Sequence, residues 1–184
     1  MKNKKILLGV AGGIASYKNC SLVNALKKNN NEVQVVMTNN ATEFITPLTF
    51  EALSKRGVIT DMFKNNEPEI IPHIYYPQEW ADLFIISATA NTLGKVANGI
   101  ADDILTSMII ASTIPVVFIP SMNTHMFENK IVQENINKLK KYGYSFIEPT
   151  TGMLACGEIG KGKYPDLKTI LESIETIIEK EQCL

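Results

Sequence analysis

Short, almost wholly apolar segments alternate with helical patterns along this chain. Strands are predicted at residues 5–10, 32–37, 82–88, 116–119 and 144–147. Helices are predicted at residues 14–28, 42–53, 92–111, 129–141 and 166–180, with Pro47 as a break or kink in the second. Because strands that alternate with helices form βαβ units, we expect an α/β fold with a mostly parallel sheet covered by helices on both faces.

The chain has 184 residues and a formal net charge of −1. This length suits one domain over residues 1–184, within which the long connections at 54–81 and 148–165 are candidates for functional loops. The near-neutral charge gives no basic patch of the kind that binds nucleic acid. Hydroxyl side chains and Pro115 interrupt the most apolar run, residues 104–120, so we predict no membrane span.

The apolar segment at the N-terminus is short and ends in Gly12 and Gly13, without the cleavage site of an export signal. We therefore expect a cytoplasmic protein. The three cysteines, Cys20, Cys156 and Cys183, are odd in number and widely spaced. They indicate neither a disulfide framework nor a metal site.

Ligands of a parallel sheet bind beyond the carboxyl ends of its strands. Four segments at those ends are rich in glycine, hydroxyl or amide groups: residues 11–16, 38–41, 87–92 and 120–126. Glycines between the first strand and the first helix allow a phosphate to approach a helix N-terminus, although a tight turn with nothing bound explains them too. The second strand ends in uncharged Thr38-Asn39-Asn40-Ala41, not in the acidic residue that holds a ribose diol, which favours a mononucleotide such as FMN.

Two of these segments contain more polar or unusual residues than a helix cap needs. Residues 87–92 (SATANT) hold four hydroxyl or amide side chains, where an N-cap requires one. After the fourth strand, Met122 suits packing on an apolar ring system and Asn123 suits binding a carboxylate or amide. An N-cap for the following helix is the structural alternative for Asn123, and the two roles are compatible.

Three motifs, in order, make the chain resemble the homo-oligomeric flavin-containing cysteine decarboxylases. Residues 87–92 resemble the family motif PASANT, and residues 120–127 resemble PxMNxxMW with Phe127 at the Trp position. Residues 152–163 resemble the substrate clamp GxLACGxxGxGR, with Lys163 in place of the last Arg. The N-terminal GxxGGIASYK also fits, and the resemblance covers nearly the whole chain. The ACG segment and the upstream His are most similar to those of the phosphopantothenoylcysteine decarboxylases.

The resemblance implies a Rossmann-like or flavodoxin-like three-layer sandwich with a substrate-clamp loop at about residues 150–164. It also implies FMN-dependent decarboxylation of 4′-phosphopantothenoylcysteine to 4′-phosphopantetheine in coenzyme A biosynthesis. Direct loss of CO2 leaves an unstabilised carbanion, so a cofactor is required. Oxidation of the substrate thiol to a thioaldehyde gives the electrons a place on sulfur, CO2 departs to leave an enethiol, and re-reduction completes the cycle.

The resemblance assigns roles residue by residue. His73 is expected to assist the oxidation, Asn123 to hold the carboxylate and Cys156 to supply a proton. Expected FMN contacts are Gly13, Ile14, Ala15, Thr38, Ala41, Thr89, Ala90, Asn91, Thr92 and Met122. Expected substrate contacts are Asn123, Met126, Ala155 and Lys163. No metal is expected.

Family members are trimers or dodecamers, so a homo-oligomer is expected. The chain ends shortly after the clamp and one helix, so any phosphopantothenate–cysteine ligase is expected to be a separate protein. The alternatives are a peptidyl-cysteine decarboxylase of the lantibiotic type, a flavin prenyltransferase, an electron-transfer flavodoxin, and a regulatory subunit that keeps the fold without the activity. The prenyltransferases lack the PxMN and ACG motifs that are present here.

Overall fold

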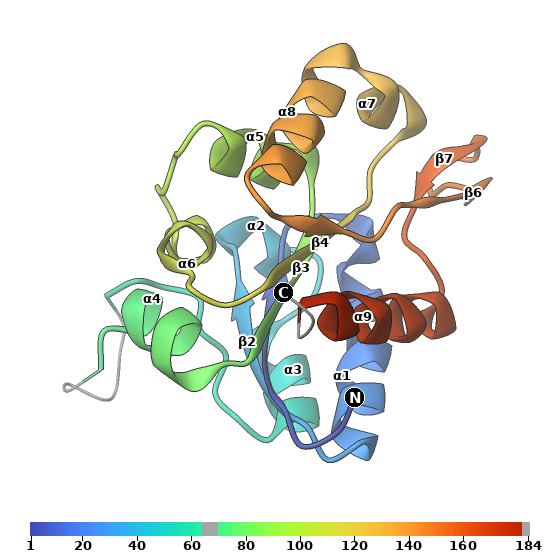
Figure 1. Cartoon of the computed structure of the whole chain (residues 1–184). Coiled ribbons are helices and arrows are strands. Elements are labelled where there is room, and N and C mark those ends of the chain that lie inside the picture. The colour runs from blue at the N-terminus through green and yellow to red at the C-terminus, as the bar shows by residue number, and fades with distance from the viewer. Residues whose placement is uncertain (64–69, 182–184) are drawn as a thin grey trace.

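The structure is a computed structural model that describes residues 1–63 and 70–181. A five-stranded, wholly parallel sheet forms its centre (Figure 1). Its strands are β1 (Lys5–Val10), β2 (Glu32–Met37), β3 (Leu83–Ala88), β4 (Val116–Pro120) and β5 (Ser145–Phe146), in the order β2-β1-β3-β4-β5. This is the flavodoxin-like order, which confirms the predicted fold class.

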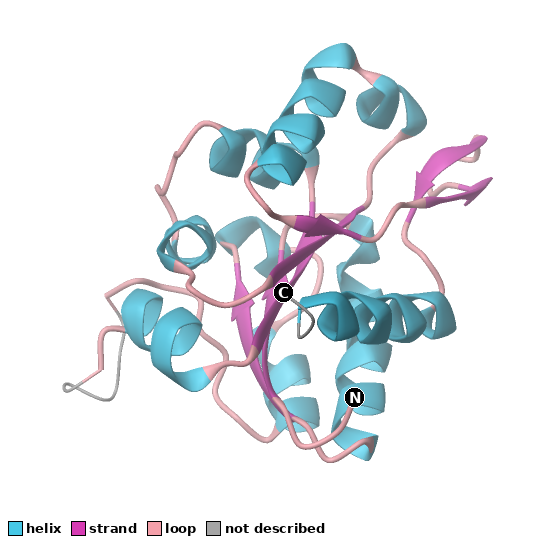
Figure 2. Ribbon diagram, in the orientation of Figure 1, coloured by secondary structure: helices cyan, strands magenta, loops and turns pink. Residues whose placement is uncertain are grey.

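Helices cover both faces of the sheet, giving three layers (Figure 2). One face packs against α1 (Asn19–Lys28), α3 (Pro47–Ser54) and α9 (Leu167–Glu181). The other face packs against α5 (Ala90–Ala97), α6 (Ile104–Ala111) and α8 (Lys130–Lys141). Because both faces are covered, β3 and β4 are buried along their whole length, which explains why their sequences do not alternate between apolar and polar residues.

Three predicted helices are divided in the structure. The segment predicted at 14–28 begins as the 3-10 helix η1 (Ile14–Lys18) before α1, and the segment at 42–53 becomes α2 (Asn39–Thr42) and α3, which starts at Pro47. The single helix predicted at 92–111 is wrong: α5 ends before Gly99, whose φ is +69°, and α6 starts after the N-cap Asp103. Gly99 and Asp103 are a stop and a start signal that the continuous apolar pattern concealed.

The two long connections contain regular structure. The first includes α4 (Pro72–Tyr75) and the π-helical turn η2 (Tyr76–Trp80). The second forms an antiparallel hairpin of β6 (Thr150–Met153) and β7 (Ile159–Lys163), which stands apart from the main sheet (Figure 1). The short helix α7 (Thr124–Glu128) lies between β4 and α8. Within the described residues, no helix combines the length and apolar character needed to cross a bilayer.

Candidate functional site

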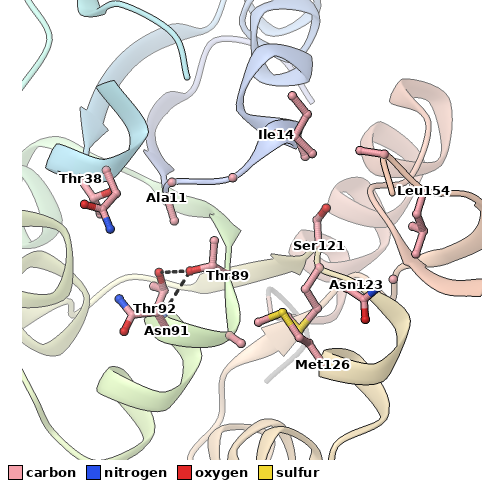
Figure 3. A pocket seen from close by; sticks show the side chains of 18 of the residues that line it. Ala11, Ile14, Thr38, Thr89, Asn91, Thr92, Ser121, Asn123, Met126 and Leu154 are labelled. Carbon is pink, nitrogen blue, oxygen red and sulfur yellow. Dashed lines mark hydrogen bonds between the residues drawn. The ribbon is translucent and has the colours of Figure 1, made fainter. Parts of the chain in front are cut away.

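A cavity of about 710 Å³ lies beyond the carboxyl ends of the parallel strands (Figure 3). Its volume is within the ordinary range for small-molecule and cofactor sites. The segments that follow β1, β2, β3 and β4 all contribute to its wall, and residues 154–156 at the hairpin tip close one side. The four segments that stood out in the sequence therefore meet at one place. They flank β1 and β3, where the strand order reverses and such sheets bind their ligands.

The turn after β1 approaches α2 closely. A Cβ on Gly12 would lie 2.5 Å from the Cβ of Asn40, so glycine at this position lets the two ligand-facing segments touch. Gly13, Ile14 and Ala15, which are expected FMN contacts, line the cavity, and Ile14 is 59% exposed. The turn thus presents backbone and one apolar side chain to a ligand.

Of the two FMN contacts expected after β2, one lines the cavity. The Thr38 hydroxyl accepts a hydrogen bond from the Ala41 N–H at 3.2 Å and so caps α2. Thr38 lines the cavity, whereas Ala41 lies directly beneath this segment with its side chain buried in the core. Asn39 and Asn40 take its place on the wall.

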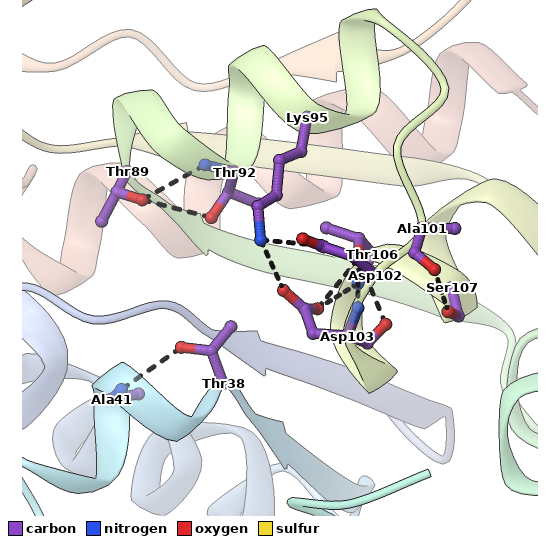
Figure 4. A network of polar contacts seen from close by, with 10 residues as sticks. All are labelled: Thr38, Ala41, Thr89, Thr92, Lys95, Ala101, Asp102, Asp103, Thr106 and Ser107. Carbon is purple, nitrogen blue, oxygen red and sulfur yellow. Dashed lines mark hydrogen bonds and ion pairs between the residues drawn. The ribbon is translucent and has the colours of Figure 1, made fainter.

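The PASANT-like segment forms the start of α5. Thr89 is the N-cap: its hydroxyl accepts the Thr92 N–H at 3.3 Å and lies 3.2 Å from the Thr92 hydroxyl (Figures 3 and 4). Thr89, Ala90, Asn91 and Thr92, which are expected FMN contacts, all line the cavity. Capping occupies Thr89 and Thr92, so among these four residues the Asn91 amide is the polar side chain that the cap does not use.

A lysine with two acidic partners forms part of the wall, and no sequence pattern had indicated it (Figure 4). The Lys95 ammonium lies 2.7 Å from the Asp102 carboxylate and 3.3 Å from that of Asp103. Its hydrogen bond with Asp102 raises the pKa of Lys95 and lowers the pKa of the Asp102 carboxyl. Asp103 also accepts the Thr106 N–H at 2.8 Å, so the cap of α6 fixes the carboxylate that faces Lys95.

Asn123 and Cys156 come together at the side of the cavity closed by the hairpin. The Asn123 Oδ1 accepts the His125 N–H at 2.9 Å and caps α7, which directs the other amide atom, Nδ2, towards the hairpin. Nδ2 lies 3.6 Å from the Cys156 sulfur and 3.1 Å from the Glu158 Oε2. Both expected roles of Asn123 are thus compatible with the structure, because the cap uses only its oxygen.

The hairpin is anchored at its base through glycine backbone. The Met122 N–H donates to the Gly162 carbonyl at 3.0 Å. A Cβ on Gly162 would lie 2.3 Å from the Met122 carbonyl oxygen, and one on Gly160 would lie 2.1 Å from the Thr124 hydroxyl. The glycines of the clamp motif therefore permit close approach of two backbones, and this packing places residues 154–156 over the cavity.

A buried polar chain connects the end of the hairpin to the turn after β1. The Tyr164 hydroxyl donates to the Asn19 Oδ1 at 2.8 Å, and the Asn19 amide donates to the Ser16 carbonyl at 3.2 Å. The Ser16 hydroxyl in turn donates to the Ala11 carbonyl at 2.9 Å. Burial raises the pKa of the Tyr164 hydroxyl far above its ordinary value. This chain fixes two opposite walls of the site relative to each other.

Lys163 lies outside the main cavity. It lines an adjoining cavity of about 280 Å³ together with Lys18, and the two cavities share Ile14, Ala15, Ser121, Leu154 and Ala155. Burial lowers the pKa of Lys18, and the nearby charge of Lys163 lowers it further. Of the other expected substrate contacts, Met126 and Ala155 line the main cavity, as does the expected flavin contact Met122.

His73 is not among the residues that line either cavity. It lies in α4, which packs against α6 and η2. Its Nδ1 is buried and has no hydrogen-bond partner among the described residues. Within a single chain, the structure therefore does not bring His73 to Asn123 and Cys156.

Several cavity residues were not predicted individually: Ala11, Gly12, Asn39, Asn40, Lys95, Asp103, Ser121, Leu154 and Gly162. Most of them belong to segments that already stood out in the sequence. Lys95 and Asp103 do not, because both lie inside the single helix that the pattern predicted at 92–111. The stop signal at Asn98-Gly99 and the N-cap at Asp103 could have revealed this corner.

Two curated relatives match almost the whole chain. The coenzyme A biosynthesis bifunctional protein CoaBC of Bacillus subtilis (strain 168) is 47% identical over 182 residues, which are 98% of this chain and 45% of the relative. The probable phosphopantothenoylcysteine decarboxylase of Streptococcus mutans serotype c is 47% identical over 175 residues, which are 94% of this chain and 97% of the relative. The chain thus spans less than half of the bifunctional relative and nearly all of the shorter one.

Solved structures agree with the sequence relatives. A PPC decarboxylase in complex with pantothenoylaminoethenethiol superimposes with a TM-score of 0.84 at 28% identity, covering 97% of this chain and 100% of that one. MrsD from a Bacillus species superimposes with a TM-score of 0.83 at 31% identity, covering 95% and 96%. The Flavoprotein family matches residues 1–179. From its strand order, its cavity and these matches, the chain belongs to the flavoprotein family, in the group that contains the phosphopantothenoylcysteine decarboxylases.

Proposed function

We propose that the protein is an FMN-dependent decarboxylase that converts 4′-phosphopantothenoylcysteine into 4′-phosphopantetheine. The observation that carries this proposal is the meeting of the Asn123 amide and the Cys156 thiol, 3.6 Å apart, at a cavity on the switch point of the sheet. An amide that orients a carboxylate beside a thiol that donates a proton meets the needs of decarboxylation. The names of the Streptococcus mutans relative and of the solved PPC decarboxylase support the same substrate.

The cavity fits FMN in the chemistry of its wall. Capped helix starts, two asparagines and an absence of acidic residues after β2 suit a phosphate, and Met122 suits an apolar ring system. The residues that would hold FMN are Gly13, Ile14, Ala15, Thr38, Thr89, Ala90, Asn91, Thr92 and Met122. When bound, FMN supplies the reversible two-electron oxidation of the substrate's cysteine. Ala41 supports this site by donating its N–H to Thr38.

The chain's own residues then act on the substrate. The Asn123 Nδ2–H holds the carboxylate, and because an amide is neutral it stabilises a leaving carboxylate less than an arginine would. After CO2 departs, the Cys156 thiol gives its proton to the carbon that carried the carboxylate. The hairpin tip at 154–156 covers the reacting atoms and limits access of water.

We further propose that the protein is a homo-oligomer, a trimer or a dodecamer, in which a second copy brings His73 to the cavity. Two observations support this: His73 is outside the cavity of its own chain, and Ile14 and Met126 leave 59% and 49% of their surface exposed at the cavity. We place the protein in the cytoplasm. A separate phosphopantothenate–cysteine ligase is our proposed source of the substrate.

Purified protein incubated with phosphopantothenoylcysteine tests the proposed reaction. We expect the protein to be yellow. We also expect release of CO2 and a product lighter than the substrate by one CO2, and mass spectrometry measures both the gas and the product. A peptide with a C-terminal cysteine is the second substrate, because a peptidyl-cysteine decarboxylase is the alternative that shares the motifs at residues 87–92 and 120–127. Turnover of the peptide alone would contradict the proposed substrate, and a colourless protein that still releases CO2 would contradict the proposed cofactor.

A further inference from the structure

The carboxylate of Glu158 lies beside Asn123 and Cys156 and contacts both. Its Oε2 lies 3.1 Å from the Asn123 Nδ2 and 3.7 Å from the Cys156 sulfur, while Nδ2 and the sulfur are 3.6 Å apart. Because the Asn123 Oδ1 accepts the His125 N–H, the amide nitrogen and not the oxygen faces the glutamate. A carboxylate therefore already sits on the donor that, in the proposed reaction, orients the substrate's carboxylate.

Glu158 is held there loosely. Its side chain is exposed, its two partners are a neutral amide and a thiol, and the described part of the chain offers it no ion pair. Hydrogen bonds at such exposed sites contribute little free energy. The backbone of the turn is fixed independently, because the Leu154 N–H donates to the Glu158 carbonyl at 2.8 Å and the Gly157 N–H to the Leu154 carbonyl at 2.9 Å. The side chain is therefore free to leave without unfolding the hairpin tip.

We propose that Glu158 is a positioning residue whose carboxylate occupies the substrate-carboxylate position on Asn123 in the free protein and is displaced when the substrate binds. This inference rests on the proposed function and names the residue that competes for its carboxylate subsite. Two carboxylates on one amide nitrogen repel each other, so binding of the substrate requires Glu158 to leave.

A second consequence follows for the thiol. In the free protein the Cys156 S–H donates to the Glu158 Oε2 at 3.7 Å, so a side chain of the same hairpin tip holds the proton of the proposed donor. When the substrate displaces Glu158, this S–H is left free to face the substrate.

Glu158→Gln tests the competition for Asn123. Glutamine keeps the size of the side chain but removes the charge that opposes an incoming carboxylate, so we expect the KM for the acid substrate to fall about five-fold. The inhibition constant of 4′-phosphopantetheine should not change, because this product lacks the carboxylate. Glu148→Gln is the matched control: Glu148 pairs with Lys140 and Lys161 near the hairpin but does not line the cavity, so its KM should equal that of the wild type.

Alkylation of Cys156 by iodoacetamide, followed by peptide mass spectrometry on the holoprotein, gives a readout that does not depend on turnover. We expect Glu158→Gln to accelerate modification of Cys156 about three-fold or more, with Cys20 as the internal reference, because an amide holds the S–H more weakly than a carboxylate does. If Glu158→Gln changes neither the KM for the substrate nor the rate of Cys156 alkylation, the inference is overturned while the proposed function stands. The inference is also overturned if the substrate KM and the inhibition constant of 4′-phosphopantetheine shift by the same factor. A wild-type protein without turnover would overturn the proposed function and the carboxylate competition together, and faster alkylation in the variant would then show only the contact with the thiol.

Discussion

At the scale of single residues, Asn123 uses its two amide atoms for two purposes. Its oxygen caps α7 and its nitrogen faces Cys156. The cap fixes which atom faces the cavity, so the local structure of a five-residue helix orients a group of the site. The sequence supported both roles for Asn123, but only the structure shows that they do not compete.

Asn123→Asp separates these roles. Aspartate is as good an N-cap as asparagine, so the free energy of unfolding should stay within about 1 kcal/mol of the wild type. The variant replaces the Nδ2 donor with a negative oxygen facing the substrate carboxylate, so kcat/KM should fall about 100-fold or more. Asn129→Asp is the matched control, because Asn129 caps α8 with the same geometry away from the cavity. Full activity in Asn123→Asp would contradict the assignment.

Tyr164→Phe tests the buried polar chain through its pH dependence. Loss of the hydroxyl leaves Asn19 without its partner, so we expect a loss of about 1–3 kcal/mol in the free energy of unfolding at pH 7. Because burial raises the pKa of Tyr164, the wild type keeps this contribution below the ordinary tyrosine pKa of about 10 and loses it progressively as the pH rises above that value.

Urea unfolding at pH 7, 9 and 10.5 measures this effect. The difference between wild type and Tyr164→Phe should be constant up to about pH 9 and shrink at the highest pH. Tyr142→Phe, at a residue that is 71% exposed, is the control and should follow the wild-type curve. A difference that grows with pH would contradict the burial of a neutral hydroxyl.

At the scale of elements, the roles of the hairpin glycines could be assigned only from the structure. The glycine-rich clamp motif suggests a mobile loop, but β6 and β7 form an ordered antiparallel pair whose backbone packs against the Met122 segment. Gly162 combines a φ of +138° with a close approach to Met122. Gly157, with a φ of +87°, has open space where a Cβ would lie, with nothing within 4 Å.

Gly162→Ala should therefore displace the hairpin, and Gly157→Ala should not. Both substitutions carry the cost of a left-handed backbone, about 1–2 kcal/mol. Only the first also forces a Cβ against the Met122 carbonyl, so its kcat/KM should fall at least about ten-fold more than that of Gly157→Ala. Steady-state kinetics and urea unfolding of both variants check this, and equal activities would contradict the proposed anchoring.

The sequence predicted the elements whose signal is local. The five apolar strands and the long amphipathic helices α8 and α9 were found within a few residues of their bounds. The hairpin was missed because its glycine-rich strands carry no alternating apolar pattern. The site followed the same rule: segments at strand ends were predicted, while Lys95 and Asp103 are brought to it by packing.

At the scale of the whole molecule, a single chain forms the cavity and places Asn123 and Cys156 at its wall, but it does not place His73 there. The order β2-β1-β3-β4-β5 places the cavity at one end of the sheet, and α4 lies against α6 and η2. The proposed oligomer accounts for this separation, because a second copy would bring His73 to the cavity.

Mixed oligomers test whether His73 acts across a subunit boundary. His73→Asn and Cys156→Ser should each lower product formation by about 100-fold or more when pure. Co-expressed with different tags and purified as hybrids, they should recover a substantial part of the wild-type activity, because some sites then combine His73 and Cys156 from different copies. Hybrids that stay as inactive as the pure variants would show that both residues must belong to one chain or that His73 has no role.

The anchoring of the hairpin at its base has a consequence for substrate preference. Gly160 and Gly162 secure β7 to the Met122 segment, whereas residues 154–159 at the tip are held mainly by their own turn. Apart from the segment 154–157, which carries the proposed proton donor, the tip side chains are therefore replaceable without loss of the support beneath them. Changes at positions 158 and 159 should then alter substrate preference while the fold and the cavity stay intact.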